Sequence, residues 1–187
     1  MATKVVGIDF GSRSVKLCES AATLRTTDLV GYDYEDLGLE PDQRPDHEML
    51  AAAAKTLLER KGLLGETIMC SPPSHMVSFL ELTLPFGSAK KIESVLPYEV
   101  DDRIPLDIED VVFDYHIMSQ VEEETRCMVA YAKKEELASF ISALNAQEID
   151  PREIGFGPLL LGATPALSDT SDQLRLIIDL GHHTTHV

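Results

Sequence analysis

A short run near the start of the chain carries the residue types of a phosphate-binding turn. It reads Asp9-Phe10-Gly11-Ser12-Arg13-Ser14-Val15-Lys16. A glycine at a turn lets backbone N–H groups approach an anion closely, because no Cβ intervenes. Ser12 adds a hydroxyl donor and Lys16 a positive charge, while Asp9 could hold a magnesium ion through water. We therefore expect Asp9, Gly11, Ser12 and Lys16 to contact the phosphates of a nucleotide.

A second run near the end of the chain repeats this order of residue types. It reads Asp179-Leu180-Gly181-His182-His183-Thr184-Thr185. Each run follows an apolar segment that stops at an aspartate, and the two lie about 170 residues apart. This repetition indicates an internal duplication, with two turns that face each other and clamp phosphates between two domains. The expected contacts from the second turn are Asp179, Gly181, Thr184 and Thr185.

Simpler interpretations of the same residues exist. Aspartate commonly ends strands, so Asp9 and Asp179 could merely form turns, and Lys16 could be a solvent-facing strand residue. The shared context of the two aspartates favours the phosphate interpretation. A metal site at the histidines 182, 183 and 186 is not expected, because Asp179 is the only carboxylate near them in the sequence.

The elements that position these turns can be predicted from the spacing of apolar residues. Strands are predicted at 4–9, 14–19, 29–34, 67–71, 77–84, 111–118, 126–132 and 174–179. Helices are predicted at 46–61, 88–100, 135–145 and 158–163. Asp46 is the expected N-cap of the first helix and Gly62 its stop. Pro97 should kink or split the second helix.

The composition is typical of a globular protein without a membrane-spanning segment. The chain has 187 residues, of which 44% are apolar and 26% charged, as in ordinary soluble globular proteins. No apolar run is long enough to span a membrane, and the start lacks the features of a signal peptide. The cysteines at 18, 70 and 127 fit neither a disulfide framework nor a zinc site, which favours a reducing cytoplasm.

The net charge of −16 argues against nucleic-acid binding, which requires a basic face. Acidic residues are concentrated between Glu99 and Glu124, where only Arg103 and His116 are basic. This segment could be a solvated surface or a docking face for a basic partner. Composition leaves both interpretations open.

Several stretches resemble the PilM/GspL family of the actin superfamily. Residues 6–16 are similar to the first phosphate loop of the superfamily, and the match continues in the same order along the chain. The further similar stretches are 82–85, 96–99, 104–115 and 129–151. The resemblance implies an α/β, actin-like (ribonuclease H-like) ATPase fold, first half, with an FtsA-type inserted subdomain. The implied division is 1–76 for the core, 77–147 for the insertion, and 148–187 for the return to the core and the start of the second phosphate-loop strand.

The resemblance also implies a function. The expected role is a cytoplasmic scaffold, peripheral to the bacterial inner membrane, of a type IV pilus or type II secretion platform. Its expected partners are the tail of a PilN-like platform protein or a GspE-like secretion ATPase, and a homodimer is also open. ATP and Mg²⁺ are expected in the cleft of the full-length protein, whereas residues 1–187 supply half a site. The pair His182-His183 departs from the family, whose members carry small or acidic residues there, and is expected to crowd the phosphate path.

Two alternatives remain. A phosphotransferase of the same superfamily, such as a sugar kinase or an exopolyphosphatase-like enzyme, also begins with Asp-x-Gly-Ser. It would need a general base for its substrate hydroxyl, and no sugar-site signature is present between residues 65 and 160. An FtsA-like tether would carry a C-terminal amphipathic membrane helix. We expect a scaffold rather than a catalyst and assign no catalytic residue.

Overall fold

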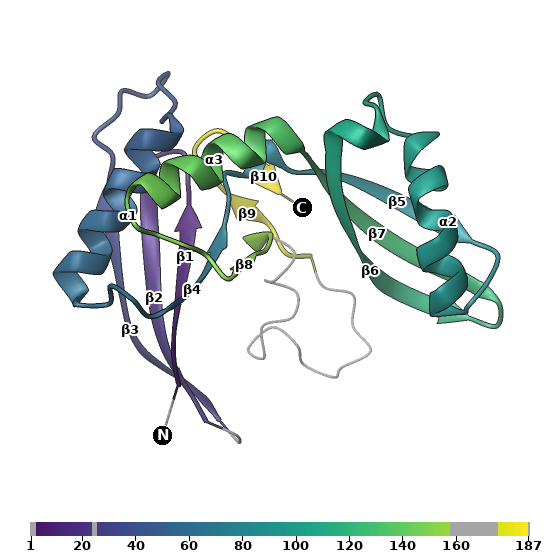
Figure 1. Cartoon of the computed structure of the whole chain (residues 1–187), viewed down its shortest axis with the longest axis horizontal. Coiled ribbons are helices and arrows are strands. Elements are labelled where there is room, and N and C mark those ends of the chain that lie inside the picture. Colours follow the sequence, from purple (N-terminus) through teal and green to yellow (C-terminus); the bar gives the residue numbers. More distant parts are fainter. Residues whose placement is uncertain (1–2, 24–25, 158–175, 187) are drawn as a thin grey trace. The chain divides into compact units, whose positions relative to one another are not determined.

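The computed structural model describes residues 3–23, 26–157 and 176–186 (Figure 1). Its contacts divide the chain into two compact units. The core unit comprises Met1–His75 with Ser139–Val187, and the inserted unit comprises Met76–Ala138. The sequence placed the return to the core at 148, whereas this division places it at Ser139. The reason is that Phe140 packs edge-on against Phe10 of the core, with ring centroids 5.0 Å apart.

The core unit contains a five-stranded sheet of order β3-β2-β1-β4-β8 (Figure 1). Its strands are β1 (Thr3–Phe10), β2 (Ser14–Ala22), β3 (Thr27–Asp36), β4 (Thr67–Ser71) and β8 (Glu153–Ile154). The first three form an antiparallel meander, while β4 runs parallel to β1 and β8 parallel to β4. Alternate side chains of β1 are buried, namely Val6, Ile8 and Phe10, as the period of a half-buried strand predicts.

Two helices cover that buried face. Helix α1 (His47–Lys61) begins at Asp46, whose carboxylate accepts a hydrogen bond from the backbone N–H of Met49 at 2.8 Å. It ends at Gly62, which has a φ of 66° that only glycine adopts readily. Both caps were predicted from the sequence and are confirmed. Helix α3 (Lys134–Ala146) buries Phe140 and Leu144.

The inserted unit is a three-stranded antiparallel sheet of order β5-β7-β6 with one long helix (Figure 1). Its elements are β5 (Ser78–Leu84), α2 (Ala89–Asp101), β6 (Val111–Val121) and β7 (Glu124–Lys133). Helix α2 runs through Pro97 without a break, so of the two expected effects the split is wrong and the kink stays a prediction. Its face of Ile92, Leu96 and Val100 is buried in the core of the unit, and this burial offsets the backbone hydrogen bond that proline cannot make.

The second turn is held by a shorter hairpin than expected. Strand β9 (Asp179–Leu180) pairs with β10 (Thr185–His186). The strand predicted at 174–179 is not formed over 176–178, where Leu176 is 71% exposed. A strand needs a neighbour for its backbone groups, and in the described part of the chain β9 pairs with β10 alone. Residues 174–175 and the helix predicted at 158–163 lie outside the described residues.

The expected α/β class is confirmed. The described helices include none that is both long and apolar enough to cross a membrane.

Candidate phosphate-binding site

The two turns are hairpins of the same build. In the first, the backbone N–H of Gly11 donates to the carbonyl of Ser14 at 3.1 Å. In the second, the N–H of Gly181 donates to the carbonyl of Thr184 at 2.9 Å. The strand positions beside the turns also correspond, because Asp9 lies opposite Lys16, and its counterpart Asp179 lies opposite residue 186.

Glycine is required in each turn by the turn's own backbone. A Cβ on Gly11 would lie 2.9 Å from the carbonyl oxygen of Ser14, and one on Gly181 would lie 2.7 Å from that of Thr184. Both distances are shorter than a carbon and an oxygen tolerate without displacement. Neither glycine therefore needs a ligand to explain it, although the absence of a side chain also leaves each turn open to an anion.

A cavity of about 330 Å³ lies between the two hairpins. It is lined by residues 9–14 and Lys16 of the first hairpin, by residues 179–182, Thr184 and His186 of the second, and by Ser71, Pro72 and Ser74. All the phosphate contacts expected from the sequence line this cavity except Thr185. The structure thus brings together residues that lie at opposite ends of the chain.

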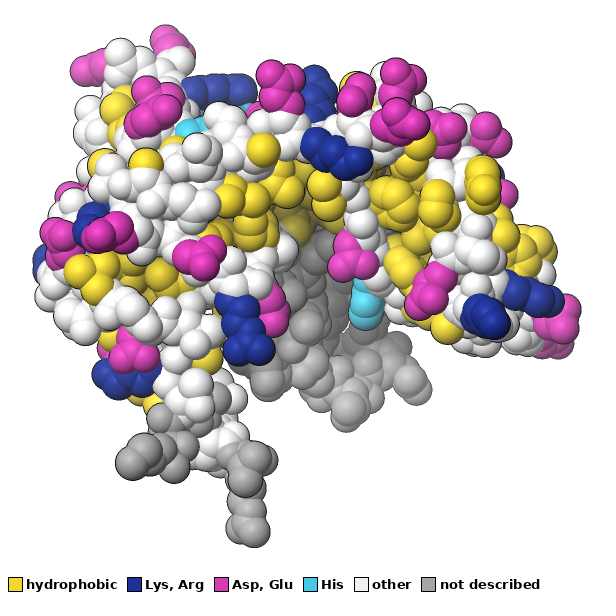
Figure 2. All heavy atoms as spheres, in the orientation of Figure 1, with side chains coloured by type: hydrophobic (Ala, Val, Ile, Leu, Met, Phe, Trp, Pro, Cys, Tyr) yellow, Lys and Arg dark blue, Asp and Glu magenta, His cyan; other side chains and the backbone are white. Residues whose placement is uncertain are grey.

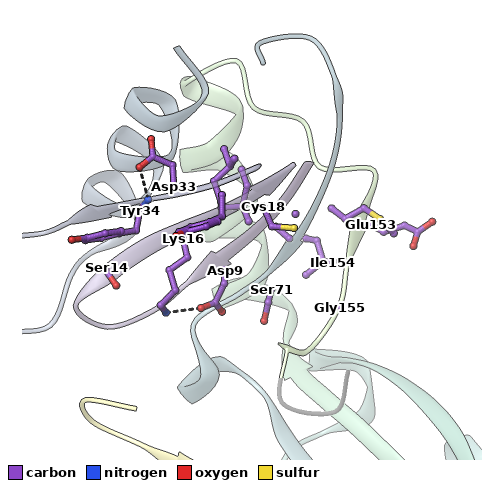
Figure 3. Close-up of a pocket in the computed structure, with 16 residues that line it drawn as sticks. Asp9, Ser14, Lys16, Cys18, Asp33, Tyr34, Ser71, Glu153, Ile154 and Gly155 are labelled. Atoms are coloured by element: carbon purple, nitrogen blue, oxygen red, sulfur yellow. Dashed lines mark hydrogen bonds and ion pairs between the residues drawn. The ribbon is translucent and has the colours of Figure 1, made fainter. Parts of the chain in front are cut away.

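Lys16 is paired with an acid in this structure. Its Nζ lies 2.8 Å from Oδ2 of Asp9, and both side chains are about half exposed (Figure 3). An exposed ion pair of this kind contributes little stability. A phosphate that entered the cavity could therefore draw Lys16 away at small cost. Mg²⁺, which is usually bound by one or two carboxylates together with phosphate oxygens, could then occupy the freed carboxylate of Asp9.

A metal site built from protein groups alone is not present among the described residues. No three side chains of His, Cys, Asp or Glu gather there in an arrangement that could hold a metal ion. Two carboxylates, those of Asp9 and Asp179, line the cavity between the hairpins.

The second hairpin is fastened to the rest of the core unit by side chains. The hydroxyls of Thr184 and Ser74 lie 2.8 Å apart and share a hydrogen bond. Ser74 begins the single-turn helix η1 (Ser74–Met76), which follows strand β4. The contact joins residues more than one hundred positions apart, and the sequence holds no signal for it.

The histidine pair is directed at a loop. Nε2 of His182 lies 3.0 Å from the carbonyl oxygen of Pro41, and Nε2 of His183 lies 3.2 Å from that of Gln43. An imidazole N–H donates in each case, because a carbonyl only accepts. His182 still lines the cavity, whereas His183 does not. Of the two histidines expected to crowd the phosphate path, only His182 is therefore placed where it could do so. The pair holds the hairpin to the loop.

His186 takes the place in the second hairpin that Lys16 takes in the first. Its ring packs edge-on against Phe156, with centroids 5.5 Å apart. Its Nε2 is buried and has no hydrogen-bond partner in the described structure. A buried polar group left unpaired costs roughly 1–3 kcal/mol. The spacing of the two runs contains this correspondence, although the sequence suggested a role for His186 only as a metal ligand.

The end of β4 also contributes to the site. The backbone N–H of Gly157 donates to Oγ of Ser71 at 2.9 Å, and a Cβ on Gly157 would lie 3.1 Å from that oxygen. The same Cβ would lie 3.8 Å from a carboxylate oxygen of Asp9. The backbone after β8 thus passes close to Asp9, an approach that a larger residue at 157 would obstruct.

A second cavity lies on the open face of the core sheet (Figure 3). It has a volume of about 830 Å³ and is lined mainly by apolar side chains, among them Tyr32, Tyr34 and Met69. Asp9, Ser14, Lys16 and Ser71 border both cavities. Burial raises the pKa of the Cys70 thiol to about 12, so this cysteine stays protonated and is a poor nucleophile.

The comparisons with known proteins bear on the fold. No protein-family model matches the sequence, and a search of curated proteins gives no match either. Among solved structures, the chain is similar to a chain of the PilM-PilN type IV pilus biogenesis complex, with 23% identity and a TM-score of 0.80. That similarity covers 97% of this chain and 56% of the other.

A second similar structure is the cytoplasmic domain of EpsL, an inner membrane component of the type II secretion system of Vibrio cholerae. The identity is 15% and the TM-score 0.50, over 81% of this chain and 57% of that one. The chain thus spans little more than half the length of either structure. The expected resemblance is confirmed at the level of the fold: the chain has an α/β fold similar to that of a chain of the PilM-PilN complex.

Proposed function

We propose that this chain is a scaffold of the inner-membrane platform of a type IV pilus or type II secretion system, and that it binds the basic cytoplasmic tail of a PilN-like protein. The observation that carries the proposal is the likeness to a chain of the PilM-PilN complex, at a TM-score of 0.80 over 97% of this chain. EpsL, the second similar structure, is also a component of such a platform. The proposal places the protein at the cytoplasmic face of the bacterial inner membrane.

The charge of the inserted unit supports a basic partner. Residues 76–138 hold fourteen acidic side chains and six basic ones. Figure 2 shows acidic side chains spread over the visible face of this unit, around α2, with fewer basic ones among them. Such a field attracts a Lys- or Arg-rich segment and accelerates its association, in a manner that salt weakens.

The cavity between the hairpins supports a second role. We propose that it takes the phosphates of a nucleotide, with Mg²⁺ held at Asp9. The free backbone N–H groups of the turns and the hydroxyls of Ser12 and Thr184 are suited to donate to phosphate oxygens, and Lys16 would supply the positive charge. Two hairpins of the same build on opposite sides of one cavity are the observation that favours this role.

The first experiment is isothermal titration calorimetry of this chain with the synthetic cytoplasmic tail of its PilN-like partner. A scrambled tail of the same charge is the control, and the titration is repeated at high salt. We expect sequence-dependent binding that weakens with salt. Equal binding of the native and scrambled tails, or no binding at low salt, would refute the scaffold role at this surface.

A parallel titration with Mg-ATP and Mg-pyrophosphate tests the second role. Because the proposed contacts of the two hairpins are to phosphates alone, we expect weak binding that is similar for the two ligands. Micromolar affinity for ATP together with none for pyrophosphate would contradict a phosphate half-site and favour a phosphotransferase.

A further inference from the structure

The inserted unit has two edge strands, β5 and β6. An edge strand carries backbone N–H and C=O groups without partners, and such edges attract other strands. Proteins protect their edges with bulges, charges, proline or very short strands. The edges of this protein differ in how they are protected.

Strand β6 is protected by its own residues. The backbone N–H of Tyr115 donates to a carboxylate oxygen of the preceding residue, Asp114, at 2.8 Å. The pairing of β6 with β7 also shifts between Ile117 and Ser119, which marks a bulge. An incoming strand would have to displace the carboxylate of Asp114 and follow an irregular edge.

Strand β3, an edge of the core sheet, has the same protection. The N–H of Tyr34 donates to a carboxylate oxygen of Asp33 at 2.8 Å. The backbone N–H of Leu37 donates to the carbonyl oxygen of Arg13, the residue before β2, so it points toward β2. Because N–H groups alternate in direction along a strand, that of Tyr34 points to the free edge. The opposite edge strand of the core sheet, β8, has only two residues and offers little to pair with.

Strand β5 lacks this protection at its centre. It has seven residues without proline, and its register with β7 shows no bulge. The side chains of Glu81 and Thr83 are exposed, and no side chain of the described residues hydrogen-bonds to the amide of either. The only charge on the strand, Glu81, forms an ion pair with Arg126 of β7.

The direction of the β5 amides follows from the pairing. The N–H of Tyr115 points away from β7, so the backbone groups of Val129, which lies opposite, point to β5. Val129 therefore bonds to its partner on β5, Leu80. By alternation, the N–H and C=O groups of Glu81 and Thr83 point to the free edge.

We propose that the tail of the partner docks at this edge as an added strand, with its backbone bonded to Glu81 and Thr83. The inference rests on the proposed function, since it names where the tail binds. Side chains alternate across a strand. Leu82 of β5 belongs to the apolar cluster under α2, and Leu80, which is partly buried, packs against that cluster. The added strand must therefore be apolar at alternate positions on that side. On the other side, the excess of acidic residues on the inserted unit favours basic side chains.

Thr83→Pro tests the backbone bond. Proline removes the outward N–H without touching the ladder to β7, and edge strands tolerate it. Thr83→Ala is the matched control, because it changes the side chain and keeps the N–H. We expect Thr83→Pro to weaken tail binding about fivefold or more, as the loss of one hydrogen bond implies. Thr83→Ala should bind nearly as well as the unaltered chain.

Hydrogen exchange locates the tail directly. Binding should slow exchange in segment 78–84 and leave segments 111–121 and 27–36 unchanged. Should Thr83→Pro prove poorly folded by circular dichroism, Glu81→Gln replaces it. Its matched control is Glu123→Gln, which removes the same charge from the β6–β7 turn. Glu81→Gln should weaken binding more than Glu123→Gln does.

The outcomes separate the inference from the function on which it rests. Tail binding that is unaffected by the β5 variants, or that protects β6 or β3, would overturn the inference and leave the scaffold role intact. Failure of the unaltered chain to bind the tail would overturn both.

Discussion

Phe140→Ala should be among the most destabilising single substitutions in the core unit. The side chain of Phe140 is fully buried. Its ring lies edge-on to Phe10 at 5.0 Å and to His47 at 5.6 Å, so it joins α3 to β1 and to the start of α1. Truncating a buried Phe to Ala costs roughly 3–5 kcal/mol, and each aromatic pair adds about 0.5–1.5 kcal/mol beyond its buried area. A typical domain is stable by about 5–15 kcal/mol, so a loss of about 4 kcal/mol is a large fraction of the total.

Urea unfolding followed by circular dichroism measures this loss. With a slope of roughly 2 kcal/mol per M, a loss of about 4 kcal/mol lowers the midpoint by about 2 M. Tyr98→Ala is the control, because Tyr98 is an aromatic residue of α2 that is 74% exposed and should change stability by less than about 0.5 kcal/mol. A loss below about 1 kcal/mol for Phe140→Ala would refute the packing of α3 on the core sheet and return that helix to the inserted unit.

Three further outcomes are expected. Gly181→Ala should loosen the second hairpin, because the new Cβ would lie 2.7 Å from a carbonyl oxygen of the same turn, and faster hydrogen exchange over 176–186 would report it. Lys16→Met should weaken pyrophosphate binding several-fold in calorimetry by removing the cation of the cavity, whereas Lys4→Met, at the far end of the hairpin, should not. The backbone N–H of Tyr34 donates a hydrogen bond to the carboxylate of Asp33, and this bond lowers the pKa of Asp33. The pairing with Arg60 of α1 lowers it further. Its stabilising effect is therefore present above about pH 4 and is lost as the pH falls through the lowered pKa. Melting temperatures between pH 6 and pH 3 should consequently fall less in Asp33→Asn than in the unaltered chain.

Short-range features of this protein could be predicted from its sequence. The strands of the first hairpin, the caps of α1 at Asp46 and Gly62, and the strands β6 and β7 all follow from periodicity and from turn residues. These features depend on residues that are close in the chain, so the same local rules act in almost any surroundings. For the same reason both phosphate turns, around Gly11 and Gly181, could be recognised as candidates.

The arrangement of the candidate site required the tertiary structure. His182 and His183 hydrogen-bond to a loop about 140 residues away, and no local pattern indicates such a contact. The same holds for the position of His186 opposite Asp179, which depends on how the second hairpin pairs. The uninterrupted path of α2 through Pro97 also depends on packing, because burial of one helix face outweighs the local preference of proline.

The order of strands was likewise a tertiary result. Sequence patterns identify β5, β6 and β7 as strands, but the pairing of the first with the third decides which of them are edges. Because of that pairing, the amides of Glu81 and Thr83 point to one free edge of the sheet. At the other edge, the carboxylate of Asp114 accepts the outward N–H of Tyr115. The sequence by itself determined most of the helices and strands and the residue types of the two turns, because these depend on neighbours in the chain. Long-range packing and strand pairing decided which side chains contact each other and which strand edges stay unpaired. Their energies depend on residues that lie far apart in the sequence.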